Sequence, residues 1–279
     1  MRVSFGLDRN WLLRFCAPEQ SAALTALFTV EQEVLASLRG ELEHQVAHAR
    51  LEWWHDELTQ LAAGASRHPA TRALARAAAQ QHRSPPDLRS LTEHVRVDLA
   101  GVAFLTRDEL DQHLRAWGNS VFREAALGAN VPAAIAEQLA NRAGSLVREL
   151  ELLAEFSRHA RAGRIYRPFS DPAESHVRWQ ADPLGGAERA DIAAREQFLL
   201  QQICDTATAT TAAARPALRV PLLWMSYAVE RSQRERPKGE NSTSDDSKQS
   251  VSTALQRALS SWRSALALSR GELPRALRC

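Results

Sequence analysis

Residues 133–162 carry apolar side chains at helical spacing over more than one face. One stripe contains Ile135, Leu139, Leu146, Leu150 and Leu153, and a second set off this stripe contains Val147, Leu152 and Phe156. A helix that is apolar around so much of its circumference is typical of the centre of a domain. Gly163 follows and ends the helix, because glycine accepts a positive φ at little cost. The pattern therefore predicts one long central helix.

Three polar groups lie along this predicted helix. Glu151, Glu155 and His159 are spaced i, i+4 and i+8, which places them on one face, roughly opposite the leucine stripe. The glycine stop is surrounded by arginines: Arg158, Arg161, Arg164 and Arg167. Cations near the C-terminus of a helix are favoured by the helix macrodipole, so a structural explanation stands beside a functional one.

Apolar stripes predict further helices along the chain. Their core residues are Leu24, Leu27, Val30, Val34 and Leu38; Ala47, Leu51, Trp54, Leu58 and Leu61; Leu88, Leu91, Val95 and Leu99; Leu110, Leu114, Trp117 and Val121; and Ile192, Leu199 and Ile203. Thr106 and Glu109 form a capping box that begins one of these helices. With 279 residues and 44% hydrophobic content, the chain can bury the core of one large domain or two small ones.

The last part of the chain changes in composition. Residues 233–250 contain no large apolar side chain, which predicts a flexible polar linker. Residues 251–270 then predict a helix with Leu255, Leu259, Trp262 and Leu266 on one stripe and Gly271 as its stop. We therefore expect a helical domain over residues 1–232, a linker over 233–250, and a C-terminal helix within 251–279 that docks on the same domain.

Charge and cysteine content bound the classes of function. The net charge of +2 creates no field that favours nucleic acid. Cys16, Cys204 and Cys279 are far apart in sequence, so we expect a reducing compartment and no disulfide framework. No signal peptide and no apolar run long enough to span a membrane is recognisable. These features predict a cytoplasmic protein and leave open peripheral contact with the inner face of a membrane.

The helix predicted over residues 41–63 has two polar faces. Arg50, Trp53 and Glu57 share a face that could line a cavity, with Arg50 suited to a diphosphate; the alternative is a surface ion pair beside a half-buried tryptophan. The other face carries His44, His48, Glu52 and His55. Two histidines at i, i+4 with a carboxylate suit Zn²⁺, but the same spacing arises on a solvated helix face. No second ligand cluster is obvious, and we predict no metal site.

Two strings in the chain are unusual. Residues 50–58 read RLEWWHDEL and are followed by His68-Pro69, and residues 160–168 read ARAGRIYRP. They resemble the "RLxWWRDEL…HPV" and "ARRGRIYLP" segments of the squalene/phytoene synthase family, in the same order and at a similar separation. Weaker likeness covers most of residues 8–229.

The resemblance implies a single-domain, all-α bundle of the isoprenoid-synthase type around a central cavity. Enzymes of this family join two prenyl diphosphates head to head, with Mg²⁺ held by two aspartate-rich motifs. The resemblance implies an isoprenoid or other lipid ligand, contacted by residues in or beside the two strings: Arg50, Trp53, Glu155, His159, Arg164 and Tyr166.

The chain departs from the family pattern at the metal-binding motifs. The aspartates of the second motif fall on Glu155 and His159, and those of the first fall near Leu35, Ala36 and Arg39. Mg²⁺ requires hard oxygen ligands, which an alkyl group or a guanidinium does not supply. The retained strings and lost aspartates resemble a non-catalytic branch, which includes the mitochondrial respiratory complex I assembly factor and bacterial relatives of unassigned role.

Three hypotheses follow. The first is a non-catalytic protein that binds a lipid or a protein partner as an assembly or accessory factor, with no catalytic residue and no cofactor. The second is an active prenyltransferase that holds Mg²⁺ through Glu31, Glu33, Glu151 and Glu155. Glu31 and Glu33, however, point about 200° apart on a helix and cannot face one metal cluster. The third is a helical scaffold without a ligand, which alone predicts a central cavity filled by side chains.

Overall fold

The computed structural model describes residues 9–40, 42–168, 186–235 and 259–278, and these residues form helices and connecting loops without a β-strand. The helices are η1 (Arg9–Phe15), α1 (Pro18–Leu35), η2 (Ala36–Leu38), α2 (His44–Ala62), α3 (Pro69–Gln80), α4 (Arg89–Ala100), α5 (Arg107–Trp117), η3 (Gly118–Phe122), α6 (Arg123–Gly128), α7 (Ala133–Leu139), η4 (Ala140–Gly144), α8 (Ser145–Ala154), α9 (Phe156–Arg161), α11 (Gly186–Thr208), α12 (Arg219–Glu235) and η5 (Arg275–Leu277). A further helix spans residues 259–269. The predicted all-α class is confirmed.

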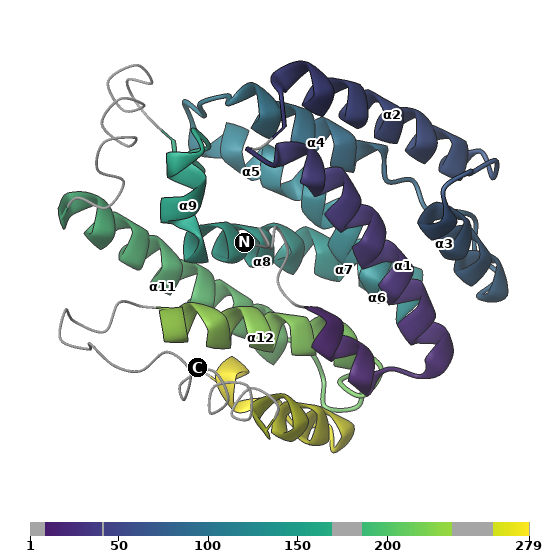
Figure 1. Ribbon diagram of the computed structural model, residues 1–279. Helices are drawn as coiled ribbons and strands as arrows, with labels where there is room; N and C mark the ends of the chain where they lie inside the picture. Colours follow the sequence, from purple (N-terminus) through teal and green to yellow (C-terminus); the bar gives the residue numbers. More distant parts are fainter. Residues whose placement is uncertain (1–8, 41, 169–185, 236–258, 279) are drawn as a thin grey trace, which may run out of the picture.

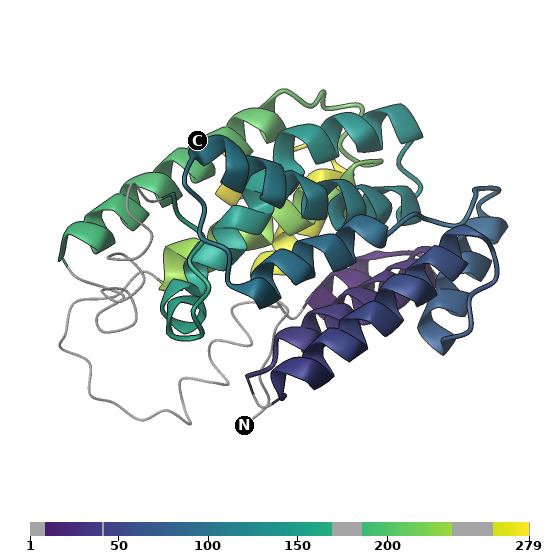
Figure 2. The same ribbon diagram turned by 90° about the horizontal axis from the view of Figure 1, so that it is seen from above.

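Helix α8 lies at the centre of the bundle, as the sequence predicts. It packs against α5, α11 and α12, and it lies in the middle of Figure 1. Its apolar residues Val147, Leu150 and Leu153 are buried. Seen from above, α1 to α3 lie on one side of the molecule and α11 with α12 on the other (Figure 2). Because α8 contacts helices on several sides, it requires the apolar circumference seen in the sequence.

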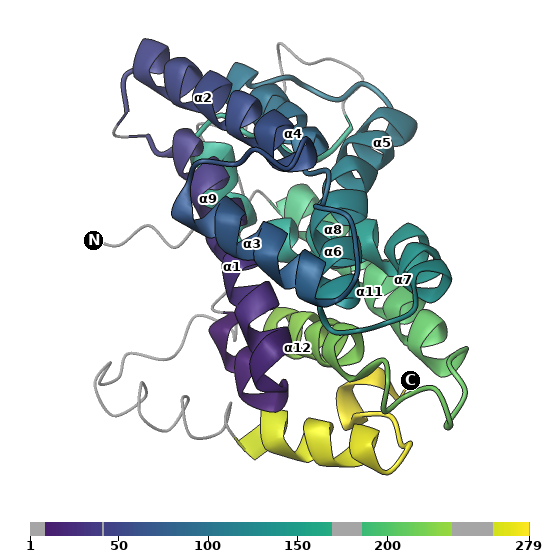
Figure 3. The same cartoon turned by 90° about the vertical axis from the view of Figure 1, so that its right-hand side faces the viewer.

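The ends of the bundle are formed by α2 and by the C-terminal helix. Figure 3 shows α2 and α4 at one end and the helix over residues 259–269 at the other. The predicted core stripe of α2 is confirmed, since Ala47, Leu51, Trp54, Leu58 and Leu61 are all buried.

Within the described ranges, no helix is both long and apolar enough to cross a bilayer.

The long helix predicted over residues 133–162 is wrong as a continuous element. The chain forms α7, the π-helical segment η4 and α8, and then breaks at Glu155, whose φ of −111° and ψ of 20° are not helical. The short helix α9 follows. Ile135, placed on the core stripe from sequence, is 36% exposed. The extra residue that a π-helical turn accommodates changes the register of side chains on either side of it, which periodicity alone does not reveal.

The C-terminal helix docks with a face other than the predicted one. Leu259 and Trp262 are 46% and 58% exposed, whereas Ala265 and Leu268 are buried. The chain turns at Gly271, which has the expected positive φ of 74°. After this turn the chain returns to the core, where Leu273 and Leu277 are buried. Their burial determines which face of the C-terminal helix points inward. Leu255 and residues 236–258 lie outside the described residues, so the predicted linker and domain division stay predictions.

The expectation about disulfides also requires correction. Cys204 is disulfide-bonded and Cys16 is a free thiol. The partner of Cys204 lies outside the described residues. Sequence separation could not reveal this bond, because cysteines far apart in a chain meet whenever the fold places them side by side.

A close crossing of two helices fixes the position of η4. Gly118, at the end of α5, lies against Gly144: a Cβ atom on Gly118 would stand 2.8 Å from the carbonyl carbon of Gly144. The predicted capping box at Thr106 and the predicted burial of Trp117 in this helix are both confirmed. The crossing is a contact between helices, and both π-helical segments occur at it.

Gly118→Ala should therefore destabilise the protein although alanine favours helices. Overpacking a tight contact costs about 1–3 kcal/mol, more than the gain in helix propensity of about 1 kcal/mol. Gly40→Ala is the control, since a Cβ there meets no atom within 4 Å. Chemical denaturation should show a loss of stability for Gly118→Ala alone. Equal stability of the two variants would contradict the close approach.

Candidate functional site

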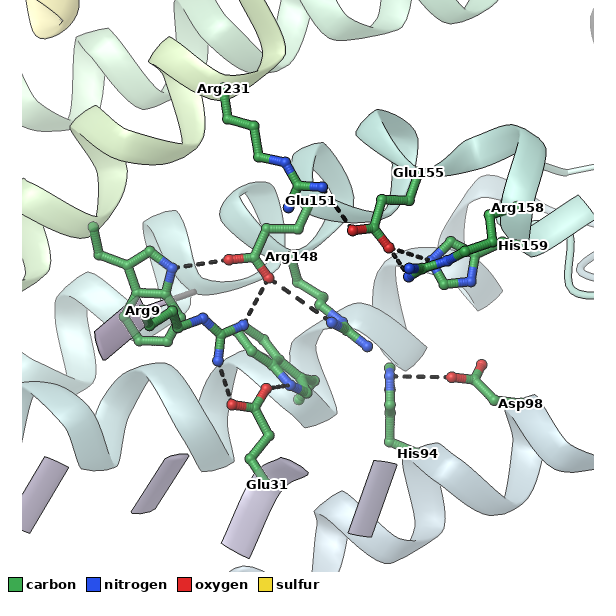
Figure 4. Close-up of polar contacts among 12 residues, drawn as sticks. Arg9, Glu31, His94, Asp98, Arg148, Glu151, Glu155, Arg158, His159 and Arg231 are labelled. Carbon is green, nitrogen blue, oxygen red and sulfur yellow. Dashed lines mark hydrogen bonds and ion pairs between the residues drawn. The ribbon is translucent and has the colours of Figure 1, made fainter. Parts of the chain in front are cut away.

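A buried arginine from the N-terminal segment lies between two helices at the centre of the protein. Arg9 in η1 forms ion pairs with Glu31 of α1 and, at 2.9 Å, with Glu151 of α8. The side chains of all three residues are at most 4% exposed. Figure 4 shows the guanidinium between the two carboxylates. Arg9 thus links three chain segments that are remote in sequence.

Two tryptophans complete the hydrogen bonds of these carboxylates. The indole Nε1–H of Trp117 donates to Glu31 and that of Trp224 donates to Glu151, each at 2.9 Å. The Arg9 guanidinium also lies 4.4 Å from the ring centre of Trp224 and 5.4 Å from that of Trp117. Aromatic faces favour a desolvated cation, and charged groups in a protein core require close opposite charges and further hydrogen bonds.

Electrostatics keep Arg9 charged despite its burial. Burial opposes the charge, but the nearby carboxylates of Glu151 and Glu31 outweigh this effect and raise the pKa of Arg9 above its ordinary value. A second arginine, Arg148, lies 3.8 Å from Glu151 and 5.0 Å from the ring centre of Trp117. Two guanidinium groups therefore balance the charges of Glu31 and Glu151.

Glu155, at the break between α8 and α9, is also held by arginines. Its carboxylate accepts a hydrogen bond from Arg231 of α12 at 2.6 Å and pairs with Arg158 of α9 (Figure 4). His159 lies 3.8 Å from the same carboxylate. Burial, followed by the positive charge of Arg164, lowers the pKa of His159 to about 3, so its ring is neutral at neutral pH.

The space among these groups is small. A cavity of about 20 Å³ is lined by Arg9, Leu35, Leu38, Arg148, Glu151, Leu152, Glu155, Arg158, His159, Tyr166 and Arg231. A cavity of this size holds about one water molecule. Pockets that bind small organic ligands measure roughly 300–1,000 Å³. The space bounded by these charged side chains is therefore much smaller than a pocket for a small organic ligand.

The structure brings together some of the predicted site residues. Glu155, His159 and Tyr166 line this cavity, and Arg164 is close enough for its charge to act on His159. Arg50 and Trp53 do not line it. Arg50 of α2 pairs with Glu33 and donates to its carbonyl oxygen at 3.1 Å. Trp53 is 49% exposed. Arg50 thus forms the surface ion pair predicted as the alternative to a role in a cavity.

Glu57 is the third member of the polar face on α2. It does not line the cavity but stabilises the turn between α2 and α3. Its carboxylate accepts hydrogen bonds from the backbone N–H groups of Arg67 and His68, both at 2.8 Å, and from the hydroxyl of Thr71. These hydrogen bonds lower the pKa of Glu57 although burial opposes them. The ring of Trp54 lies 5.0 Å from that of His68. The string over residues 50–58 and the following His68-Pro69 are thus joined physically where α2 turns into α3.

The histidines on the outer face of α2 remain near one another. His44 and His48 lie 3.0 Å apart at Nε2, His44 is exposed and His48 partly buried, and Glu52 pairs with Arg96. Among the described residues, the group whose ligand atoms could surround one metal ion lies elsewhere, at His94, Asp98 and His113. Sequence reasoning missed this group, since only His94 and Asp98 are one helical turn apart and His113 comes from another helix.

Arg9, Trp224 and Arg231 were also missed. Their roles arise from contacts across more than 70 positions of the chain. The available signal was Glu31, a carboxylate flanked by Val30 and Val34 on an apolar helix. A charged residue in a core stripe requires a buried partner, although the sequence does not say which one.

The comparison with protein families matches this arrangement to a known fold. Residues 6–232 match the model of the squalene/phytoene synthase family. The chain belongs to this family. A search of curated proteins returned no match.

Membership in the squalene/phytoene synthase family accounts for both strings. The first forms the turn around Glu57, and the second forms the stop of α9. At this stop Gly163 has a φ of 75° and Arg164 donates its backbone N–H to the carbonyl of His159 at 3.0 Å. Ile165 and Tyr166 are buried immediately afterwards. In this family member, both strings therefore have structural roles that do not require a ligand.

The central ion pairs can be tested through stability. Arg9→Ala leaves two buried carboxylates without their shared cation, and breaking a buried pair in this way costs about 3–5 kcal/mol. Arg50→Ala, which breaks a half-exposed pair, should cost at most about 1 kcal/mol. Urea denaturation of both variants measures the difference.

A second substitution separates charge from lost packing. In the Arg9→Ala background, Glu31→Gln removes one of the unpaired charges and should recover part of the lost stability. The Arg9 guanidinium does not stabilise the contact between α1 and α8 if Arg9→Ala lowers the free energy of unfolding no more than Arg50→Ala does. The same conclusion follows if Glu31→Gln lowers it further in the Arg9→Ala background.

Proposed function

We propose that this member of the squalene/phytoene synthase family does not condense prenyl diphosphates and acts as an accessory or assembly factor for a protein partner. The observation that carries the proposal is the buried guanidinium of Arg9 between Glu31 and Glu151. It occupies, with its own positive charge, the position between two helices where a cation would have to sit if these carboxylates were metal ligands.

The residues do not fit a Mg²⁺ site of the type that the active alternative requires. Prenyl diphosphate chemistry needs cations to stabilise the developing charge of the leaving diphosphate. Of the four carboxylates in that alternative, Glu31 and Glu151 are paired with Arg9, and Glu155 with Arg158 and Arg231. Glu33 pairs with Arg50. Mg²⁺ would have to displace an arginine from each of them.

The positions expected for the first aspartate motif support the same conclusion. Leu35, one of these positions, lines the small cavity together with Glu155 and His159. An alkyl side chain offers no ligand, and a neutral imidazole is a poor ligand for a hard cation. The positions of both motifs that line this cavity therefore carry an apolar group, an arginine-paired carboxylate and a neutral imidazole.

The small volume of this cavity favours an accessory role over a prenyl-binding role. A prenyl chain needs a long apolar cavity, whereas the space among the charged groups around Glu155 measures about 20 Å³. We therefore favour a protein partner over an isoprenoid ligand. The exposed Trp53 and Trp262 are the kind of side chain that protein interfaces often use.

The proposal is tested by titrating farnesyl diphosphate into the protein with and without Mg²⁺ in a calorimeter, followed by chromatography for a head-to-head product. An active family member assayed in parallel is the positive control. We expect no binding heat that depends on Mg²⁺ and no product, because the carboxylates are paired with arginines.

Two other outcomes would contradict the proposal. Mg²⁺-dependent binding with product formation would establish the active prenyltransferase. Binding without Mg²⁺ and without product would establish a non-catalytic prenyl-binding protein. It would contradict the choice of a protein partner over an isoprenoid ligand.

A further inference from the structure

A second polar cluster is buried at the crossing of α4 and α5. His94 and Asp98 lie one turn apart on α4, and His113 lies on α5. Their side chains are at most 5% exposed. The ligand atoms that the three residues offer all lie within 4.8 Å of one another. Figure 4 shows His94 facing Asp98, beside the central arginine cluster.

Hydrogen bonds determine where the His94 proton lies. Its Nδ1 is 3.1 Å from the backbone carbonyl oxygen of His113, which can only accept, so Nδ1 carries the proton. In a neutral imidazole, Nε2 then carries a lone pair. This Nε2 lies 3.6 Å from Oδ2 of Asp98, and neither atom has a hydrogen-bond partner. Two buried lone pairs therefore face each other.

Protonation of His94 does not remove the repulsion between these two lone pairs. Burial, and after it the neighbouring His113, lowers the pKa of His94 well below its ordinary value, and the positive charge of Arg148 acts in the same direction. The Asp98 carboxyl is ionised, because the hydrogen bond from His113 and the positive charge of Arg148 lower its pKa against the effect of burial. Neutral imidazole and ionised carboxylate are the forms that bind metal ions.

We propose that His94, Asp98 and His113 form a binding site for one divalent transition-metal ion of the zinc class. Two imidazole nitrogens and one carboxylate oxygen suit Zn²⁺ and its neighbours, whereas Mg²⁺ prefers oxygen ligands alone. A cation between Nε2 of His94 and Oδ2 of Asp98 satisfies both orphan atoms.

The neighbours of the site are compatible with this occupant. Nε2 of His113 lies 3.1 Å from Oδ1 of Asp98, so metal binding replaces this hydrogen bond and moves the His113 proton to Nδ1. The carbonyl that holds Nδ1 of His94 is the type of outer partner that orients metal-binding histidines. The positive charge of Arg148 opposes the binding of a cation at this site. Its guanidinium, however, also contacts Glu151 and the ring of Trp117.

Two more aromatic groups border the site. Tyr166 stacks near His113 with ring centres 6.3 Å apart, and His159 lies edge-on to Tyr166 at 5.3 Å. Burial, the negative charge of Asp98 and the approach of the Tyr166 hydroxyl to that carboxylate raise the pKa of Tyr166, so the hydroxyl stays protonated and faces Asp98. Nδ1 of His159 is buried without a hydrogen-bond partner. The three ligands thus lie in an enclosed, polar setting that excludes bulk water.

The test is a metal titration of the full chain after removal of bound metal with a chelator. Co²⁺ is the spectroscopic probe, and Zn²⁺ affinity is measured by competition with a coloured chelator. We expect one equivalent of Co²⁺ to produce visible absorption bands and Zn²⁺ to raise the melting temperature. Asp98→Asn and His94→Gln should each weaken Zn²⁺ binding by at least about 100-fold, since loss of outer partners alone costs 10–100-fold.

His48→Gln is the matched control, because the pair of His44 and His48 is the rival zinc site. This variant should keep the one-equivalent site. Loss of binding in His48→Gln with retention in Asp98→Asn would overturn the proposal, and so would the absence of stoichiometric binding in the unmodified protein.

The wild-type protein provides a measurement that does not depend on whether the variants fold. Zn²⁺ should shift the ring resonances of His94 and His113 in a histidine NMR spectrum. A shift confined to His44 and His48 would place the ion on the outer face of α2 and contradict the buried site.

Discussion

The arrangement of the central helices depends on the guanidinium of Arg9. Moving a carboxylate from water into a protein core costs several kcal/mol, so Glu31 and Glu151 are stable there only with a close cation and further hydrogen bonds. Arg9 supplies the cation, and Trp117 and Trp224 supply the additional donors. Because Arg9 comes from η1, the N-terminal segment is part of the core. The orientation of α1 against α8 thus depends on a residue that precedes both helices.

The same interaction explains how clustered carboxylates are stable in this fold without a bound ion. In a site that binds metal ions, clustered carboxylates repel one another until the ions arrive. Here arginines fixed in the chain neutralise Glu31, Glu151 and Glu155 permanently, and their long side chains fill the space between the helices. Internal cations therefore stabilise the fold without a ligand. A fold does not by itself determine function.

Local patterns in the sequence predicted the elements better than their junctions. The core stripe of α2, the capping box at Thr106 and the stops at Gly163 and Gly271 depend on neighbouring residues, and all are present. The break at Glu155 and the inward face of the C-terminal helix depend on contacts made elsewhere in the chain. The Arg9 network is of the same kind. Glu31 indicated that a buried partner must exist, but only the fold identifies the partner.

Arg148 connects the central cluster with the histidine cluster. Its guanidinium is 3.8 Å from Glu151, and its charge also acts on His94 and Asp98. It therefore shares its charge between two carboxylates on opposite sides. A divalent ion bound to Asp98 would repel Arg148 and drive it toward Glu151, which would strengthen the pairing at the centre. Metal binding at the crossing of α4 and α5 would thus be coupled to the stability of the α1–α8 contact through one side chain, and by linkage each would affect the other equally.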